Sequence, residues 1–309
     1  MRWRGREKSE NVEDRRAQSG RRGFGFPFPR GGGQSGRGVR IPMPRGKGGG
    51  IGIIGLIIVV VIMLMLGVDP RVLLEGGGSP SLSERTTSQP TEISAEDREK
   101  GEFVAVVLKD TEKYWSQQFA ASGNAYDPPT LVMFRDFVSS SCGTGQAEMG
   151  PFYCPLDNKV YIDLSFYDDL QERFRAPGDF AQAYVIAHEI GHHVQTLLGV
   201  TQQVMQAKAR ASEREANAIQ VRMELQADCF AGLWARFAQQ DLKVLDPGDI
   251  DEALGAAAAI GDDRIQKRTT GYVVPDAFTH GSSEQRVTWF RRGFESGNFE
   301  ACDTFGGQF

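Results

Sequence analysis

Residues Ala183–Gln195 read AYVIAHEIGHHVQ and place His188, Glu189 and His192 in the spacing H-E-x-x-H. Positions four apart on an α-helix lie about 40° from each other around its axis, so the two imidazoles can reach one metal ion. Glu189 follows the first histidine directly, where its carboxylate can reach a water on that ion without being a ligand. Three of the chain's four histidines lie in this turn and a half, which makes a chance match a poor explanation. We therefore predict a catalytic metal site on this helix.

The ends of this helix can also be predicted from the sequence. Asp179 follows Pro-Gly and is a suitable N-cap, and Gly199 is a suitable residue to end the helix in the left-handed conformation. Gly191 lowers the helix propensity, so we expect it to allow the close approach of a neighbouring element. His193 lies five positions after His188 and points about 140° away from it, which makes it the poorer ligand.

A catalytic zinc site uses three protein ligands and one open position, so the two histidines need a third donor. The best candidate is Glu224 in the helical stretch MELQADCFAGLWA. Asp228 lies four residues further on the same helical face, where it could accept the free N–H of a ligating histidine and fix its tautomer. The alternative is a pair of ordinary exposed acids, as we expect for Glu213. Apolar residues surround Glu224 and Asp228, however, and a buried acid without a partner is costly.

The chain has 309 residues and a net charge of −5, and its charge is unevenly distributed. Residues 1–50 contain 13 Lys or Arg and only four acids, together with many Gly and Pro. Such a segment cannot bury enough apolar surface to fold, so we predict a disordered basic tail. Its Arg-Gly runs with interleaved Phe are compatible with binding to nucleic acid or anionic lipid. A solvated tail that sets membrane topology is favoured, and no nucleic-acid partner is expected.

Residues 51–68, IGIIGLIIVVVIMLMLGV, form an uncharged apolar run close to the roughly 20 residues that cross a bilayer as a helix. A signal peptide is the alternative, but the run is long for one and no small-x-small cleavage pattern follows. Because the positive charge precedes this transmembrane helix, we predict a single-pass protein with a cytoplasmic N-terminus and an extracytoplasmic body. Residues 69–95 are predicted to be a flexible linker, and residues 96–309 the globular domain.

The order of elements in this domain indicates an α+β fold in which helix predominates and the sheet is small. The predicted strands are Thr130–Val138 and Lys159–Phe166. Besides the H-E-x-x-H helix, the predicted helices are Glu96–Ala121, Phe166–Phe174, Gln202–Ala238, Pro247–Lys267 and Ser282–Gly293.

The four cysteines, Cys142, Cys154, Cys229 and Cys302, all follow the predicted span. An even number on the outer side of a membrane suggests disulfides. Cys142 and Cys154 would close a short loop and are the favoured pair, and Cys229 and Cys302 then pair by elimination. A cysteine metal site is the alternative, but the spacing lacks the C-x-x-C form.

Together these motifs resemble a known family. HEIGHH followed by ELQADC is similar to the gluzincin metalloproteases, which have a third-ligand Glu and an Asp one turn later. A larger set of stretches resembles the bacterial family of putative neutral zinc metallopeptidases, over roughly residues 100–305 and the N-terminal anchor. These stretches are SCGTGQAEMGPFYCP, VYIDLSFYDDL, AYVIAHEIGHHVQ, ELQADCFAG and THGSSEQRVTWFRRGFESG. The resemblance implies a zincin-like fold and one Zn²⁺ per chain on His188, His192 and Glu224.

The resemblance also implies a residue that stabilises the oxyanion. In related gluzincins a downstream His, Tyr or Arg hydrogen-bonds the tetrahedral oxyanion. His280 in FTHGSSEQR is therefore the candidate, with Arg286 or Tyr272 as substitutes. The alternative is a surface loop histidine that caps the following helix.

These features predict a membrane-anchored zinc endopeptidase of the bacterial cell envelope, placed on the periplasmic side by the resemblance. Glu189 would act as general base on a metal-activated water. A peptide or protein substrate would add as a strand along Lys159–Ser165, if that strand is a sheet edge. The alternative is a catalytically silent, membrane-tethered, metal-binding scaffold protein. Glu189 separates the two hypotheses, because a purely structural metal site has no need of a base.

Overall fold

The computed structural model describes residues 1–17, 93–146 and 150–306. Its helices are α2 (Ala95–Ala121), α3 (Phe166–Glu172), α4 (Asp179–Leu197), α5 (Val200–Lys208), α6 (Glu213–Gln240), α7 (Asp249–Ala259), α8 (Asp262–Thr269) and α9 (Ser283–Ser296), with short 3-10 turns η3 (Pro275–Ala277) and η4 (Phe299–Cys302). Its strands are β1 (Val12–Asp14), β2 (Thr130–Phe134), β3 (Phe137–Ser140), β4 (Gly143–Gln146), β5 (Phe152–Cys154) and β6 (Lys159–Asp163). The predicted α+β fold, with more helix than sheet, is confirmed.

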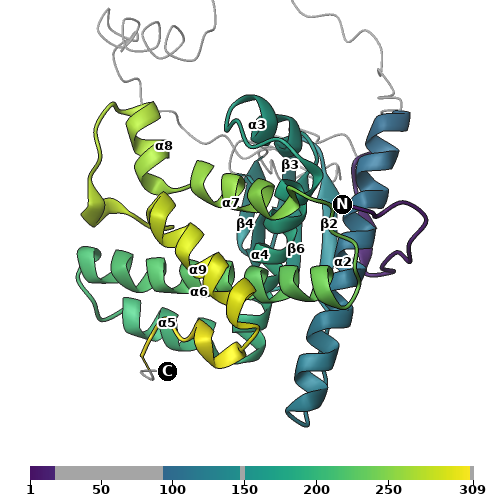
Figure 1. Ribbon diagram of the computed structural model, residues 1–309. Helices are drawn as coiled ribbons and strands as arrows, with labels where there is room; N and C mark the ends of the chain where they lie inside the picture. Colours follow the sequence, from purple (N-terminus) through teal and green to yellow (C-terminus); the bar gives the residue numbers. More distant parts are fainter. Residues whose placement is uncertain (18–92, 147–149, 307–309) are drawn as a thin grey trace, which may run out of the picture. The chain divides into compact units, whose positions relative to one another are not determined.

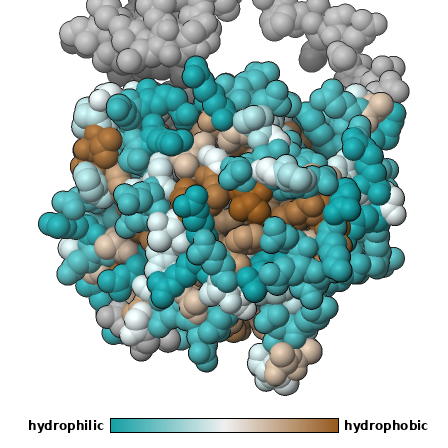
Figure 2. Space-filling view, viewed as in Figure 1, coloured by the Kyte–Doolittle hydropathy of each residue, from teal (hydrophilic) through white to brown (hydrophobic). Residues whose placement is uncertain are grey.

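Helix α4, which carries the H-E-x-x-H motif, lies at the centre of these elements (Figure 1). It packs against α6 and α7, against α2, and against the strands β5 and β6. Nearly all of its side chains from Phe180 to Gln195 are buried as a result. Figure 2 shows hydrophobic residues gathered at the middle of one face, over α7, with hydrophilic residues around them.

The larger sheet has the strand order β1-β2-β6-β5. The pairs β1–β2 and β2–β6 are parallel, and β5 runs antiparallel to β6. The expectation that the Lys159–Ser165 strand is a sheet edge is therefore wrong, because β6 is paired on both sides. The edge strand next to α4 is β5. It has three residues, which is too short for a sequence pattern to predict it.

The ends of α4 differ slightly from the prediction. The N-cap is Gly178, whose φ of 119° suits glycine, and Asp179 is the first helical residue. The capping carboxylate comes instead from Glu252 of α7, which accepts the Phe180 N–H at 3.0 Å. The C-terminal end is as predicted, because Gly199 has a φ of 78° and stops the helix.

Gly191 allows the close approach that its sequence position predicts. A Cβ atom at this position would lie 3.0 Å from the Cα of Ala227 in α6. Ala227 lies between Glu224 and Asp228 in the sequence, so the contact brings both acids beside α4.

Helices α6 and α9 also pack backbone to backbone. A Cβ at Gly232 of α6 would lie 2.1 Å from the carbonyl oxygen of Phe290, and one at Gly293 of α9 would lie 2.0 Å from that of Cys229. No side chain fits between the helices at these two points. This contact positions the N-terminal half of α9, which contributes Arg286 to the interior.

Two predicted helices are each divided in the structure. The stretch Gln202–Ala238 contains most of α5 and most of α6, because Ser212 forms a capping box with Glu215 and starts a new helix. The stretch Pro247–Lys267 contains α7 and α8, which are separated at Gly261.

The prediction of a disordered tail is wrong for its first 17 residues. They pack on the domain, contribute β1 to the sheet and bury Trp3 in the hydrophobic core. Contacts between residues group them with residues 93–306 in one compact unit. The rest of the predicted tail lies outside the described residues.

The predicted membrane span, residues 51–68, and the predicted linker up to residue 92 also lie outside the described residues. Among the helices that the structure describes, none combines the length and the apolar character needed to cross a membrane. The chain is described again just before α2, whose N-cap is Ser94.

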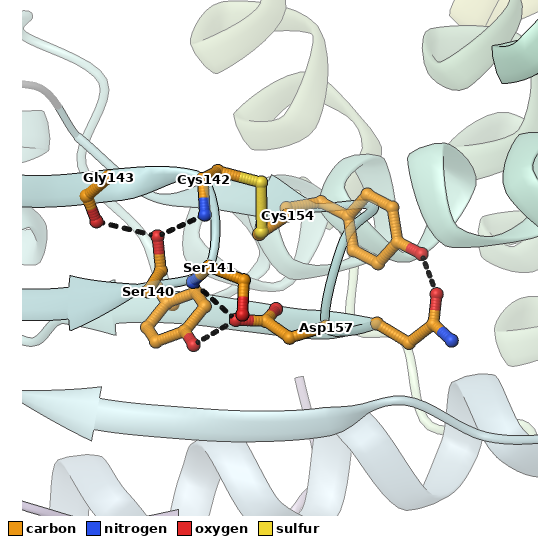
Figure 3. Close-up of a disulfide and its surroundings, with 9 residues drawn as sticks. Ser140, Ser141, Cys142, Gly143, Cys154 and Asp157 are labelled. Atoms are coloured by element: carbon orange, nitrogen blue, oxygen red, sulfur yellow. Dashed lines mark hydrogen bonds between the residues drawn. A yellow bond between two sulfur atoms is a disulfide. The ribbon is translucent and has the colours of Figure 1, made fainter.

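Both predicted disulfides are present. Cys142–Cys154 joins the turn of the β3–β4 hairpin to the last residue of β5 (Figure 3). Beside it, the Asp157 carboxylate accepts hydrogen bonds from the Ser141 N–H and the Tyr161 hydroxyl. The edge strand β5 is therefore fixed at its C-terminal end.

The second disulfide, Cys229–Cys302, joins α6 to η4 near the C-terminus. Gln226 of α6 adds a hydrogen bond from its side-chain amide to the Cys302 carbonyl, at 3.2 Å. Together they hold the C-terminal residues against the helix that carries Glu224.

Gly293→Ala should destabilise the protein by about 3 kcal/mol, because the added Cβ would force α6 and α9 apart. Urea unfolding of the two proteins would measure the difference. Gly255→Ala on α7 is a matched control, since nothing lies within 4 Å of a Cβ at that position. It should be neutral or stabilise the protein by up to roughly 1 kcal/mol. Equal destabilisation by both substitutions would contradict the close helix packing.

Candidate metal centre

Three side chains from two helices converge on one point: His188 and His192 from α4 and Glu224 from α6. One donor atom of each lies within 4.8 Å of the others. Glu224 Oε2 is 3.2 Å from His188 Nε2 and 3.4 Å from His192 Nε2. The four-residue spacing puts the histidines on one face of α4, and the contact at Gly191 brings α6 close to that face.

This donor set fits a zinc ion. Zinc binds imidazole nitrogen and carboxylate oxygen at about 2.0–2.2 Å, which places two donors of a tetrahedral site roughly 3.3 Å apart. The distances from Glu224 to the two histidines agree with that separation. Three protein donors also leave a fourth position open, as in catalytic rather than structural zinc sites. His188, His192 and Glu224 are therefore the residues that would hold the ion.

Both histidines are oriented by a partner on their other ring nitrogen. Asp228 accepts the Nδ1–H of His188 at 2.9 Å, and the side-chain oxygen of Gln195 accepts that of His192 at 2.9 Å. Each ring then presents its unprotonated Nε2 to the ion. The prediction that Asp228 lies behind a histidine ligand agrees with this geometry. The partner of the other histidine, Gln195, was missed, although its place three residues after His192 puts it on the same helical face.

Asp228 is the centre of a buried network from three helices. Arg286 of α9 donates from Nε to Oδ2 at 2.8 Å and from Nη2 to Oδ1 at 2.9 Å. The hydroxyl of Tyr184 on α4 donates to the same Oδ1. Arg286 and Asp228 are both almost completely buried, so each charge is compensated by the other.

The charges in this network shift the pKa values of its members. Burial would lower the pKa of His188, but Asp228 and Glu224 raise it to about 9. Burial would raise the pKa of Asp228, but Arg286 and His188 lower it to about 2. Burial also opposes ionisation of Glu224, yet the two histidines hold its pKa well below the usual value. Both carboxylates are ionised at neutral pH, and metal binding at His188 would compete with protonation of its ring.

The converging donors line a cavity of about 380 Å³. Phe152 and Tyr153 of β5 and Phe166 of α3 contribute apolar and aromatic surface to it. Glu189 lines the same cavity. Within the described part of the chain its carboxylate makes no hydrogen bond and no ion pair, and it acts on His192 only through its charge.

The structure places the three candidate oxyanion residues differently. His280 lines the cavity, and its loop is held by Asp262, which accepts the His280 backbone N–H at 2.6 Å and lies 3.2 Å from ring Nδ1. Arg286 also reaches the cavity, but its guanidinium is bound to Asp228. Tyr272 is 64% exposed and does not line the cavity. Tyr272 therefore lies outside the cavity, whereas Arg286 reaches the cavity with its guanidinium paired to Asp228.

His193 is turned away from the three donors. Its Nε2–H donates to the Asp127 carbonyl at 2.7 Å, and its Nδ1 lies within hydrogen-bond distance of the Tyr153 hydroxyl, at 3.1 Å. Burial lowers the pKa of His193, so the ring is neutral and suits these two bonds. It connects α4 to β5 and helps to fix the edge strand beside the cavity.

Asp228→Asn should weaken zinc binding about 10–100-fold, because the amide no longer attracts the proton on His188 and leaves Arg286 without a counter-charge. Competition with a chelator would measure the affinity, and circular dichroism would check that the variant is folded. Glu284→Gln is the matched control: it removes one exposed acid from the same helix as Arg286 and should leave the affinity unchanged. Similar losses in both variants would mean that only overall charge matters.

Comparison with known proteins agrees with this geometry. Residues 1–305 match the family described as putative neutral zinc metallopeptidase. The chain is 51% identical over 306 residues to the uncharacterized protein YpfJ of Escherichia coli K12, with 99% of both chains covered. It is 42% identical over 217 residues to the uncharacterized protein Rv2575 of Mycobacterium tuberculosis H37Rv, which covers 63% of this chain and 72% of that protein. No solved structure matches it. The chain therefore belongs to the putative neutral zinc metallopeptidase family.

Proposed function

We propose that this protein is a zinc-dependent endopeptidase in which Glu189 is the general base. The observation that supports this most directly is the position of Glu189, in the same cavity as the three converging donors and without a partner among the described residues. A metal site that only stabilises a scaffold protein has no need of such a carboxylate. The family description supports a peptidase as well.

In this proposal different residues of the chain would carry out different steps of the reaction. A zinc ion at this site would acidify a water in its open position and polarise a substrate carbonyl. Glu189 would accept the proton of the attacking water and pass it to the nitrogen of the leaving amine. His280 would donate from Nε2 to the carbonyl oxygen as that oxygen gains negative charge. Asp262, whose Oδ1 lies 3.2 Å from the other ring nitrogen, would orient the His280 ring.

The substrate is proposed to bind along β5. This strand pairs with β6 on one side only, and its residues Phe152 and Tyr153 line the cavity. An extended peptide could add to the free side and gain main-chain hydrogen bonds. The Cys142–Cys154 disulfide and the His193–Tyr153 hydrogen bond would keep the edge rigid while a peptide binds.

The domain is proposed to work in an oxidising compartment such as the outer side of a bacterial membrane. Cys142 and Cys154 pair, and Cys229 and Cys302 pair, which leaves none of the chain's four cysteines free. Disulfides of this kind persist outside the reducing cytosol. The apolar residues 51–68 would attach the enzyme to the membrane.

Glu189→Gln should lower kcat/KM by about 10²–10⁴-fold, because the amide cannot accept the proton, and it should leave zinc binding intact. The measurement is cleavage of a diverse peptide library by the full chain, with bound zinc determined by mass spectrometry. Glu213→Gln, an exposed acid at the start of α6, is the matched control and should retain full activity. If the parent binds zinc and cleaves nothing in the library, the scaffold hypothesis gains support.

His280→Ala should lower kcat by about 10²–10³-fold with little change in zinc affinity, because an oxyanion donor acts mainly in the transition state. Steady-state kinetics on a peptide identified from the library would show the split between kcat and KM. Unchanged kcat would show that His280 is a loop histidine held by Asp262.

A further inference from the structure

Residues 1–17 are joined to the domain through both backbone and core contacts. The Trp3 ring lies in the hydrophobic core, 5.5 Å from the Phe103 ring of α2 in an edge-on arrangement. The Ser9 N–H donates to the Ala105 carbonyl of α2 at 2.9 Å. Strand β1 extends the sheet beyond β2, and the N-terminal segment lies against α2 (Figure 1).

Helix α2 carries two buried acids whose partners come from this segment. Asp110 is 1% exposed and Glu112 is also buried. Arg6 binds both carboxylate oxygens of Asp110, and Ser9 and Asn11 donate to Glu112 at 2.5 and 2.8 Å. Burial raises the pKa of Asp110 although Arg6 opposes the shift, so this acid depends on its partner. Without the segment, α2 would expose its apolar face and lose the cation that its buried acid requires.

The segment also reaches the helix that carries the metal donors. The Met1 nitrogen lies 2.6 Å from Asp179, the first residue of α4, and 3.3 Å from Asp249 of α7. The Arg2 N–H donates to the Val244 carbonyl, just before α7. Residues 1–17 therefore contact α2, α4, the region before α7 and the sheet.

The positive charge of this segment is used inside the fold. Its six Lys and Arg residues all form ion pairs with described acids: Arg2 with Asp246, Arg4 with Glu99, Arg6 with Asp110, Lys8 with Glu102, Arg15 with Glu13, and Arg16 with Asp14. Four of the six acids belong to the domain. Because these cations are paired with acids within the fold, they are not unpaired positive charges beside the predicted membrane span.

We infer that residues 1–17 are a fixed part of the catalytic domain and lie in the same compartment as residues 93–306. A single membrane crossing would put about 30 Å of hydrocarbon between its two flanks. In the structure, Arg16 donates a hydrogen bond to the Asp97 carbonyl, so the chain on either side of the gap is in direct contact. The topology predicted from charge, with a cytoplasmic N-terminus and an extracytoplasmic domain, is incompatible with these contacts.

A cross-link within the full chain tests this inference. Lys8 and Glu102 form an ion pair of 2.9 Å and are both about half exposed, so Lys8→Cys with Glu102→Cys leaves the core undisturbed. The native cysteines are all paired and do not react with maleimide. Intact cells that express the variant would be treated with a short, membrane-permeant bismaleimide. The chain would then be cut at a protease site introduced between residues 69 and 92 and separated on a denaturing gel.

We expect most of the treated chain to remain one band after the cut, because the cross-link joins the two fragments. The matched control is Lys8→Cys with Asp276→Cys, in which the second position lies on η3 and pairs with Arg214 instead. This control should give two fragments. Two fragments from the test pair would overturn the inference, and so would a cross-link that forms only after the membrane is dissolved in detergent. A band at twice the mass would show that the segment docks on a second copy, which would also overturn it.

Discussion

The carboxylate of Asp228 holds the site together, because three helices meet on its two oxygens. It accepts hydrogen bonds from His188 on α4 and from Arg286 on α9, while it belongs to α6. A carboxylate in this position would be very costly alone, and Arg286 would be equally costly without it. Each of the three helices is therefore required by the other two. The orientation of a metal donor follows from the packing of the whole helical layer.

That packing depends on residues with no chemistry of their own. Gly191 lets α4 approach α6, and Gly232 and Gly293 let α6 approach α9. A side chain at any of these points would move a donor or its partner by a distance that matters for metal binding, since ligand positions tolerate only small errors. The glycines and the buried ion pair therefore both fix the relative positions of α4, α6 and α9.

The parts of the site that could be predicted from sequence are those fixed by helical spacing. The histidine pair and the pair Glu224–Asp228 each follow from positions one turn apart, and Glu189 follows from its place directly after His188; both depend only on local geometry. Arg286 lies 58 residues beyond Asp228 on a helix that also carries Arg291 and Arg292. No local pattern distinguishes the buried arginine from its exposed neighbours, so its role required the tertiary structure.

The N-terminal residues were misjudged for a related reason. The Gly- and Pro-rich part dominates the composition of residues 1–50. The first 17 residues differ from the rest of this stretch. Trp3 packs in the hydrophobic core, and Arg6 forms an ion pair with Asp110 of α2. An ion pair of this kind joins segments that are far apart in the sequence. The sequence of the N-terminal segment alone shows only its excess of positive charge.

Charge balance supports the proposal that this cavity holds a divalent cation and catalyses hydrolysis. Asp228 and Arg286 cancel, which leaves the negative charges of Glu224 and Glu189 beside two imidazoles that are neutral when they act as donors. A divalent ion makes this set neutral, which matters because uncompensated charge is expensive in a buried site. In the proposed reaction a water would give its proton to Glu189, so the charge would move between groups within the cavity and the total would stay the same. That proton transfer would then avoid the cost of creating net charge away from solvent.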